Sequence, residues 1–256
     1  MDLKLTDRVA LVAGSSRGIG RAIAAALLAE GARVCITGRD AASLAETATA
    51  LRKEYPAAQI LEATGDLTDT KTITSTIAAI QKQWGRLDIL VANLGSGSGK
   101  TGWELDEAEW ERLFNLNFFA STRLAQSAIP AMANGGSIVF ISSIAGVEAT
   151  GAPLPYSAAK AALLNYSKNL ARVVADKKIR VNTIAPGNIL FPGGSWEKHL
   201  AKDRAGVEEY IAKEVPQNRF GTPEEIAALT VFLCSGISAF ATGSCYVMDG
   251  GQTRTI

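Results

Sequence analysis

Tyr156 and Lys160 have the types and the spacing that suit proton transfer to the oxygen of a carbonyl group. They stand four positions apart, so on a helix both side chains project from one face. A phenol has a reference pKa of about 10, and an ammonium one helical turn away favours the phenolate and lowers that pKa. Such a pair alone usually marks only a surface contact. Here Ser143 precedes it, and a glycine-rich turn lies near the N-terminus.

That turn, AGSSRGIG, occupies residues 13–20, after the first apolar run and before the first helical pattern. Glycine allows a tight turn and lets the backbone approach a pyrophosphate at the positive N-terminus of a helix. The spacing is G-x-x-x-G-x-G and not G-x-G-x-x-G, so its place between a strand and a helix carries the argument. We predict that the turn binds a dinucleotide through Gly14, Ser16, Arg17, Gly18, Ile19 and Gly20.

The end of the second predicted strand indicates which dinucleotide binds. Folds that select NAD place an acidic side chain there, whereas this chain has Gly38 followed by Arg39, with Arg17 in the first turn. Two guanidiniums suit a 2′-phosphate, since a charge-assisted hydrogen bond contributes about 1.5–3 kcal/mol. Asp40 is the one carboxylate nearby, and we assign it to the N-cap of a helix that begins at Ala41. The prediction is therefore NADP(H) and not NAD(H).

Further cofactor contacts are predicted after the third and fourth strands. Asp66 and Leu67 follow the third strand, where the adenine is expected; the alternative for Asp66 is to cap the next helix. Asn93 and Gly95 follow the fourth strand, along the expected path of the cofactor. The next segment, GSGKT at 97–101, looks like the end of a Walker A loop, but it lacks the first glycine and follows the wrong strand. We predict a flexible loop beside the active site and no hydrolysis of nucleoside triphosphates.

The elements that position these residues alternate regularly between short apolar runs and longer alanine-rich helical segments. The predicted strands are Val9 to Ala13, Val34 to Thr37, Ile60 to Ala63, Ile89 to Ala92, Ser137 to Ile141, Arg180 to Ala185 and Cys245 to Met248. The predicted helices include Arg21 to Glu30, Ala41 to Glu54, Lys71 to Trp84, Glu107 to Ala133 and Ser157 to Asp176. Strands that are apolar throughout are typical of parallel sheets buried on both faces. We predict one α/β domain over residues 1–256, a Rossmann-type doubly wound parallel sheet of about seven strands with helices on both faces.

One stretch, residues 188–215, departs from this alternation. It begins with Phe191 to Gly194, FPGG, and continues as an amphipathic helix that carries Trp196, Leu200 and Tyr210. Its place after a strand end favours a substrate lid hinged at the glycines. The alternative is an ordinary surface excursion.

Composition excludes several classes of function. Lys+Arg number 26 and Asp+Glu 25, so the net charge of +1 attracts neither nucleic acid nor an anionic membrane. No long apolar stretch or signal core is present, which favours a cytoplasmic protein. Cys35, Cys234 and Cys245 have apolar neighbours and are expected to be core residues, not a disulfide or metal site. With His199 as the single histidine, and expected to be a solvated lid residue, we predict no metal centre.

The chain resembles the short-chain dehydrogenase/reductase family over nearly its whole length, and looks closest to 3-oxoacyl-carrier-protein reductases and related carbonyl reductases. The matching motifs are the Gly14, Gly18 and Gly20 turn, Asn93 to Gly95, Asn117, Ser143, Tyr156-x-x-x-Lys160, Pro186-Gly187 and Val247 to Gly251. Each motif is short, and their order and spacing together are specific. Three positions depart from the family pattern: Ala13 and Phe191 replace threonines, and Leu94 replaces an alanine. The missing threonine at 191 removes a hydrogen bond to the nicotinamide carboxamide.

The resemblance implies a role for each member of a catalytic tetrad. Tyr156 is the general acid, Lys160 lowers its pKa and holds the nicotinamide ribose, and Ser143 stabilises the developing oxyanion. Asn117 positions a water that links Lys160 to solvent. Neighbours of the same type, Ser142 and Asn115, are set aside by spacing and by the family pattern. Contacts to the cofactor after the sixth strand are implied for Pro186, Gly187 and Ile189.

The expected activity is NADPH-dependent reduction of a β-keto ester, a 3-oxoacyl thioester or another hydrophobic ketone. Phe191 and Trp196 make the substrate side more apolar than a sugar dehydrogenase needs. One alternative is an alcohol dehydrogenase that oxidises a steroid, polyol or hydroxy acid, and another is a non-catalytic NADP(H) sensor. The family also implies a homotetramer or homodimer, with the helices at 107–133 and 157–176 in one interface and the strand near Cys245 in the other.

Overall fold

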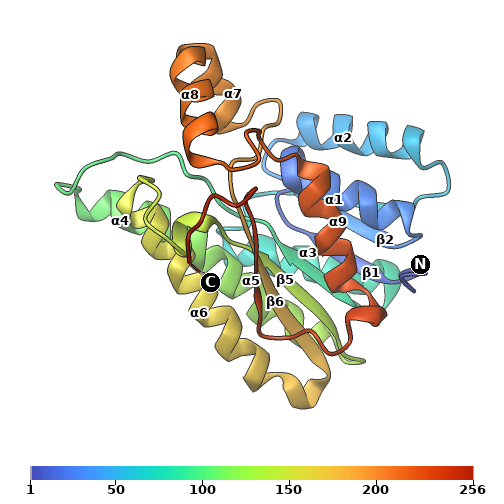
Figure 1. Ribbon diagram of the computed structural model, residues 1–256. Coiled ribbons are helices and arrows are strands. Elements are labelled where there is room, and N and C mark those ends of the chain that lie inside the picture. Colours follow the sequence, from blue (N-terminus) through green and yellow to red (C-terminus); the bar gives the residue numbers. More distant parts are fainter. Residues whose placement is uncertain (1, 256) are drawn as a thin grey trace.

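A parallel sheet of seven strands, in the order β3-β2-β1-β4-β5-β6-β7, forms the centre of the computed structural model, which describes residues 2–255 (Figure 1). The strands are β1 (Val9–Val12), β2 (Arg33–Gly38), β3 (Ile60–Thr64), β4 (Ile89–Ala92), β5 (Gly136–Ile141), β6 (Ile179–Pro186) and β7 (Cys245–Met248). Val12 of β1 pairs with Ile36 on one side and with Val91 on the other. The predicted sheet and its doubly wound arrangement are confirmed.

Helices cover both faces of the sheet, which explains why its strands are apolar throughout. The longer helices of these layers are α1 (Gly18–Ala29), α2 (Ala41–Glu54), α3 (Thr70–Trp84), α4 (Glu107–Phe114), α5 (Ala120–Ala128), α6 (Leu154–Val173) and α9 (Pro223–Cys234). Short 3₁₀ turns are η2 (Ile129–Ala131), η3 (Ile144–Gly146), η4 (Ala175–Lys177) and η5 (Gly236–Ser238). Ala10 and Val12 of β1 pack in a core with α1, α2 and α9, while Val9 and Leu11 pack with α3, α5 and α6.

The strand order reverses between β1 and β4. From β1 the chain winds outward to β2 and β3, and from β4 it winds the other way. In sheets of this kind, ligands bind outside the carboxyl ends of the strands at the point of reversal. The residues that follow β1, β4, β5 and β6 therefore meet along one edge of the sheet.

The predicted helix at 107–133 contains a π-helical turn, η1 (Asn115–Phe119), between α4 and α5. A π turn inserts one extra residue into a helix and shifts the faces that follow it. Asn117, inside this turn, is fully buried, whereas Phe119 is 44% exposed. The helical assignment is confirmed, and the π turn is a feature that the residue pattern did not predict.

Residues 195–214 form two helices, α7 (Ser195–Lys202) and α8 (Arg204–Glu214), and not the single amphipathic helix that was predicted. Asp203 separates them, because its backbone is extended and its carboxylate caps α8 by accepting a hydrogen bond from the Gly206 amide at 3.0 Å. Trp196 stacks on Tyr210 with ring centroids 5.5 Å apart. In Figure 1 the two helices stand away from the three main layers. Their function as a lid, and the single-domain assignment of the chain, stay predictions.

Cys35 and Cys234 are buried, but Cys245 is exposed, so its predicted core position is wrong. The reason is that β7 is an edge strand whose alternate residues face outward. Over residues 2–255, no helix combines the length and the apolarity needed to cross a bilayer.

Candidate active site

The glycine-rich turn between β1 and α1 has no room for side chains at its glycines. Gly14 and Gly18 have φ angles of 64° and 54°, in the left-handed region that favours glycine. A Cβ on Gly20 would lie 2.2 Å from the Gly14 carbonyl oxygen. The Asn93 amide donates to the carbonyls of Ala13 and Gly14 at 3.3 and 3.2 Å, so the end of β4 holds the turn.

Two hydroxyls that the sequence analysis did not single out also fix this turn. The Ser15 hydroxyl donates to the Val12 carbonyl at 2.8 Å and accepts from the Thr37 amide at 2.8 Å. The Thr37 hydroxyl accepts from the Gly14 amide at 2.9 Å. Their signal in the sequence is a hydroxyl residue next to a glycine near the end of each of the first two strands. Ser15 follows Gly14, and Thr37 precedes Gly38.

The charges around the turn fit a dinucleotide that carries a 2′-phosphate. Arg17 and Arg39 are both exposed at this edge of the sheet. A Cβ on Gly38 would lie 3.1 Å from the Ser16 Cβ, so an acidic side chain has little space there. Asp40 caps α2 by accepting from the Ser43 amide at 2.8 Å, which confirms the predicted cap. The polar groups present therefore suit NADP(H), and the nearest carboxylate is already engaged.

The two residues after β3 differ in how they face the site. Leu67 is buried in the core between the sheet and α3, so only its backbone is available to a cofactor. The Asp66 carboxylate accepts from the Thr68 amide at 2.9 Å, while Asp69 caps α3. The alternative role of Asp66 as the cap of the next helix is therefore taken by Asp69.

Ser143, Tyr156 and Lys160 come together at the carboxyl ends of β4 and β5. The Ser143 hydroxyl lies close enough to the Tyr156 phenol to favour its ionised form. The Lys160 ammonium donates to the Ile141 carbonyl at 3.0 Å and to the Leu94 carbonyl at 3.3 Å. The three side chains thus link two strand ends to the first two turns of α6.

The neighbours Ser142 and Asn117 complete this arrangement. The Ser142 hydroxyl donates to the Lys160 carbonyl at 3.0 Å, so Ser142 fastens α6 to the sheet. A Cβ on Gly95 would lie 2.7 Å from Asn117 Oδ1 and 2.8 Å from Lys160 Nζ, so both side chains pack directly against this glycine. Of the two adjacent serines, it is Ser143 that contacts the phenol.

Burial opposes the charged form of both titratable groups. It lowers the pKa of Lys160 to about 8. It also raises the pKa of Tyr156, against the opposing effect of the nearby Ser143 hydroxyl. The predicted lowering of the Tyr156 pKa by Lys160 is therefore wrong in this structure. The physical reason is that the ammonium is directed at two backbone carbonyls and lies 5.9 Å from the centroid of the phenol ring.

The residues after β6 pack closely against their surroundings. Pro186 ends β6, a Cβ on Gly187 would lie 2.7 Å from the Asp249 Cβ, and Ile189 is buried and pairs with Gly221. These contacts fix the path of the backbone past the end of β6, where contacts to nicotinamide are expected.

The expected role of Phe191 and Trp196 on the substrate side stays a prediction, and the structure shows what the two rings pack on. The Phe191 ring packs over the glycine turn, with an atom 2.5 Å from where a Cβ on Gly18 would stand. Trp196 packs on Tyr210 of α8 and on Phe220, which follows it in the chain. The Arg17 guanidinium donates to the Gly193 carbonyl at 3.1 Å, so the predicted hinge of the lid contacts the predicted phosphate site.

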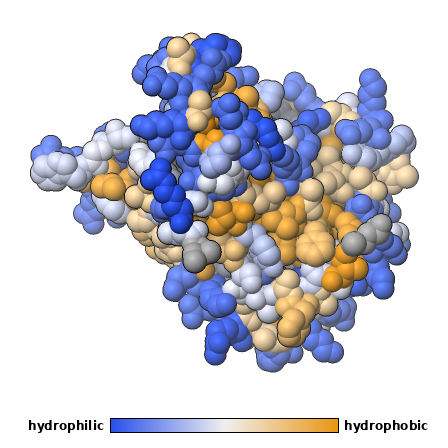
Figure 2. Space-filling view, viewed as in Figure 1, coloured by the Kyte–Doolittle hydropathy of each residue, from blue (hydrophilic) through white to orange (hydrophobic). Residues whose placement is uncertain are grey.

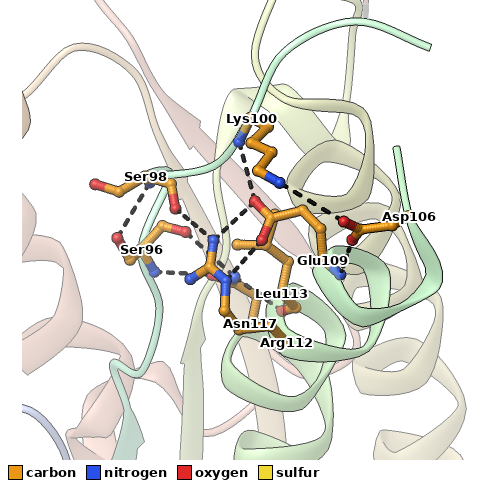
Figure 3. Close-up of polar contacts among 8 residues, drawn as sticks. All are labelled: Ser96, Ser98, Lys100, Asp106, Glu109, Arg112, Leu113 and Asn117. Atoms are coloured by element: carbon orange, nitrogen blue, oxygen red, sulfur yellow. Dashed lines mark hydrogen bonds and ion pairs between the residues drawn. The ribbon is translucent and has the colours of Figure 1, made fainter. Parts of the chain in front are cut away.

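The loop at 95–103 lies beside Tyr156, as predicted. A flexible loop is the prediction from sequence, whereas hydrogen bonds hold this loop in the structure. Figure 3 shows the side chains of Glu109, Arg112 and Asn117 directed at this loop from α4 and η1. Sequence reasoning missed Glu109 and Arg112, whose i,i+3 spacing at the start of the helix after β4 was the available signal. Within residues 2–255, no group of three or more His, Cys, Asp or Glu side chains is placed to hold a metal ion.

Comparison with known proteins agrees with this geometry. A family profile described as enoyl-(acyl carrier protein) reductase matches residues 13–253. The chain is 37% identical to the rhamnolipids biosynthesis 3-oxoacyl-[acyl-carrier-protein] reductase of Pseudomonas aeruginosa, over 96% of each protein. The chain belongs to the short-chain dehydrogenase/reductase family.

Other relatives place this short-chain dehydrogenase/reductase among oxidoreductases. It is 36% identical to the 3-oxoacyl-[acyl-carrier-protein] reductase of Escherichia coli, over 98% of this chain and 99% of that protein. Its structure superposes with a TM-score of 0.94 on L-sorbose reductase from Gluconobacter frateurii in complex with NADPH and L-sorbose, at 35% identity over the whole of both chains. The protein is therefore an oxidoreductase of this family.

Proposed function

We propose that this protein is an NADPH-dependent carbonyl reductase that converts a ketone to a secondary alcohol. The observation that carries the proposal is the proximity of Ser143 to Tyr156, one turn from Lys160 and at the same sheet edge as the glycine turn. Arg17 and Arg39 beside that turn support NADP(H). The named relatives support reduction, since each is called a reductase.

NADPH, when bound, supplies the hydride that adds to the carbonyl carbon. Tyr156 donates its phenolic proton to the carbonyl oxygen, and Ser143 donates a hydrogen bond that stabilises the negative charge developing on that oxygen. Lys160, one helical turn from Tyr156, would hold the nicotinamide ribose through its ammonium. Asn117 orders the backbone beside Lys160, along the route by which a proton returns from solvent.

The proposed substrates are a β-keto ester, a 3-oxoacyl thioester or another hydrophobic ketone. A polar ketose is a second candidate, because the Phe191 ring packs at Gly18 and the Trp196 ring stacks on Tyr210, so part of the apolar surface of both rings is already covered. The similarity to L-sorbose reductase favours the same second candidate.

The assembly is proposed to be a homotetramer, with a homodimer as the alternative. Apolar side chains that are more than one third exposed occur at the end of α9, on η5, in the segment that follows η5 and on β7: Phe232, Ile237, Phe240 and Val247. Figure 2 shows apolar residues over this part of the surface. The outer edge of β7, the last strand of the sheet, can also pair with a strand of another copy.

The test is NADPH oxidation with a panel of an acyl thioester, a β-keto ester, an aryl ketone, a diketone and a ketose, with NADH as the control cofactor. We expect turnover with NADPH, and we expect Tyr156→Phe to lower kcat by a factor on the order of 10³ because the proton donor is lost. The dissociation constant of NADPH should change less than about threefold, since the phenyl ring is kept. Equal turnover by Tyr156→Phe would favour a role other than catalysis at this site, and turnover only in the direction of oxidation would favour an alcohol dehydrogenase.

A further inference from the structure

The loop between β4 and α4, residues 95–103, forms no helix or strand and contains Gly95, Gly97, Gly99 and Gly102. Glycine-rich chain loses more conformational entropy on ordering than other chain, so such a loop is expected to move unless it is tied down. The structure ties it to α4 and η1 at three successive points (Figure 3).

The first point is Ser96. Its amide donates to Asn117 Oδ1 at 2.9 Å, and its carbonyl accepts from Asn117 Nδ2 at 3.2 Å. Asn117 Nδ2 also donates to the Leu113 carbonyl at 3.0 Å, which fixes the amide in its buried position. This attachment belongs to the predicted catalytic tetrad.

The other two points belong to an ion pair outside that tetrad. Arg112 Nη2 donates to the Ser98 carbonyl at 3.0 Å, and Glu109 Oε1 accepts from the Lys100 amide at 3.0 Å. The two side chains also bind each other in a bidentate fork, from Nε to Oε2 at 2.7 Å and from Nη2 to Oε1 at 2.8 Å. Bidentate charge-assisted pairs fix geometry as well as adding strength. Glu109 is only 8% exposed, so solvent competes little for its oxygens.

Hydrogen bonds also keep this pair charged. The hydrogen bond from Arg112, supported by the one from the Lys100 amide, lowers the pKa of Glu109 to about 2. Glu109 therefore stays ionised, and the attachment persists, throughout the pH range in which Tyr156 and Lys160 titrate.

The attached loop forms a wall directly beside the phenol. A Cβ on Gly97 would lie 3.8 Å from Cζ of Tyr156, the ring carbon that bears the hydroxyl. On the other side, a Cβ on Gly99 would lie 2.7 Å from Leu113 Cδ1 and 3.2 Å from Glu109 Oε1. The backbone of residues 96–99 is therefore held between the ion pair and the proposed proton donor.

We propose that the Glu109–Arg112 pair is a positioning unit that holds residues 96–99 at a fixed distance from Tyr156, and thereby limits the size of the ketone substituent on that side. This inference rests on the proposed carbonyl reduction. The wall presents glycine backbone and two serines held close to the phenol, so it fits a small substituent such as a methyl group.

Two variants test the wall in opposite directions, with β-keto esters that carry methyl, propyl or phenyl on the keto carbon. Arg112→Ala releases the loop, and we expect KM for the methyl substrate to rise about tenfold with kcat changed less than about threefold. The preference for methyl over phenyl should fall by a similar factor. Gly97→Ala narrows the space, because its Cβ would be in ordinary contact with the phenol, and should lower kcat/KM for the phenyl substrate about tenfold.

A measurement that needs no turnover accompanies these assays. Amide hydrogen exchange of residues 96–101 should quicken by about tenfold or more in Arg112→Ala, while the dissociation constant of NADPH stays within about twofold. Arg52→Ala is the matched control, because Arg52 likewise joins a glutamate, Glu62 at 2.8 Å, to a backbone carbonyl, that of Ile60 at 3.3 Å, beside the outer strand β3. The control should leave loop exchange and substrate preference unchanged.

An unchanged substrate preference together with unchanged exchange at 96–101 in Arg112→Ala would overturn the proposal. If that variant does not fold, Glu109→Gln takes its place, since it keeps the shape of the side chain and removes its charge; it should shift both readouts in the same direction. If the wild-type protein reduces no ketone, the proposed function fails, and the exchange measurement still decides whether the pair positions the loop.

Discussion

Lys160 is 3% exposed, and burial lowers its pKa to about 8, well below the value of an exposed lysine. Its ammonium is kept in place by the carbonyls of Ile141 and Leu94, which replace part of its hydration. Burial of the charged Lys160 ammonium beside Tyr156 therefore lowers the free energy of unfolding. A cost of that kind is common at functional sites, where a buried ionisable group serves chemistry and not stability.

The cost of burying Lys160 gives stability a particular dependence on pH. Between about pH 8 and 10.5, the ordinary pKa of a lysine, the unfolded chain binds a proton at Lys160 that the folded protein does not bind, so stability rises with pH in this window. Below pH 8 both states are protonated and the penalty is constant. Compared with Lys160→Met, the free energy of unfolding of the wild-type protein should increase by roughly 3 kcal/mol from pH 7.5 to 10.5. Urea unfolding of both proteins at several pH values measures this difference, and parallel curves would contradict it.

At the scale of elements, residues 191–194, the predicted hinge of the lid, contact the glycine turn directly. The Phe191 ring packs on Gly18, and Gly193 accepts a hydrogen bond from Arg17. If the turn binds pyrophosphate through Gly18, the ring has to move away before the phosphate reaches that glycine. Binding of the cofactor and movement of residues 191–194 are then linked, because Gly18 cannot contact the Phe191 ring and the pyrophosphate at the same time.

A substitution at the hinge tests this link. Phe191→Thr removes the ring and restores the hydroxyl that the family pattern has at this position, so the dissociation constant of NADPH should fall about fivefold. Phe220→Thr is the control, because it makes the same chemical change in a ring that packs on Trp196. Fluorescence titration with NADPH measures both constants. Weaker binding by Phe191→Thr would show that the ring supports the cofactor and does not obstruct it.

At the scale of the whole molecule, the exposed apolar residues at one edge of the sheet need an explanation. Phe240 is 103% exposed, and Val247 on the edge strand β7 is 41% exposed. Contiguous apolar surface of this kind usually marks an interaction site. A second copy of the chain is the occupant that we propose, because β7 also leaves backbone groups unpaired along the same edge.

Disruption of that surface should change the assembly. We expect the wild-type protein to be a tetramer, and Phe240→Asp to produce a smaller species, because a charge in an apolar interface is costly to bury. Thr49→Asp, on the exposed side of α2, should leave the mass unchanged. Light scattering coupled to size-exclusion chromatography measures both. A wild-type monomer, or a Phe240→Asp variant of unchanged mass, would count against this interface.

The sequence by itself determined the sheet, the glycine turn and the four residues proposed for catalysis. Continuous apolar runs identify buried parallel strands, and the turn follows from Gly14, Gly18 and Gly20, because only glycine satisfies their backbone conformations and close contacts. The spacing of Tyr156 and Lys160 placed both on one helix, as the structure has them on α6. These features depend on the types of the residues and on their spacing along the chain.

Only the tertiary structure decided the features that depend on contacts between distant segments. The direction of the Tyr156 pKa follows from burial and from where Lys160 donates its hydrogen bonds, which spacing along a helix does not specify. The contact of Phe191 with Gly18 and the attachment of Ser98 by Arg112 join residues far apart in sequence or separated by a loop. Such contacts arise when the sheet brings the ends of several strands to one edge, so they are set by packing and not by any local pattern.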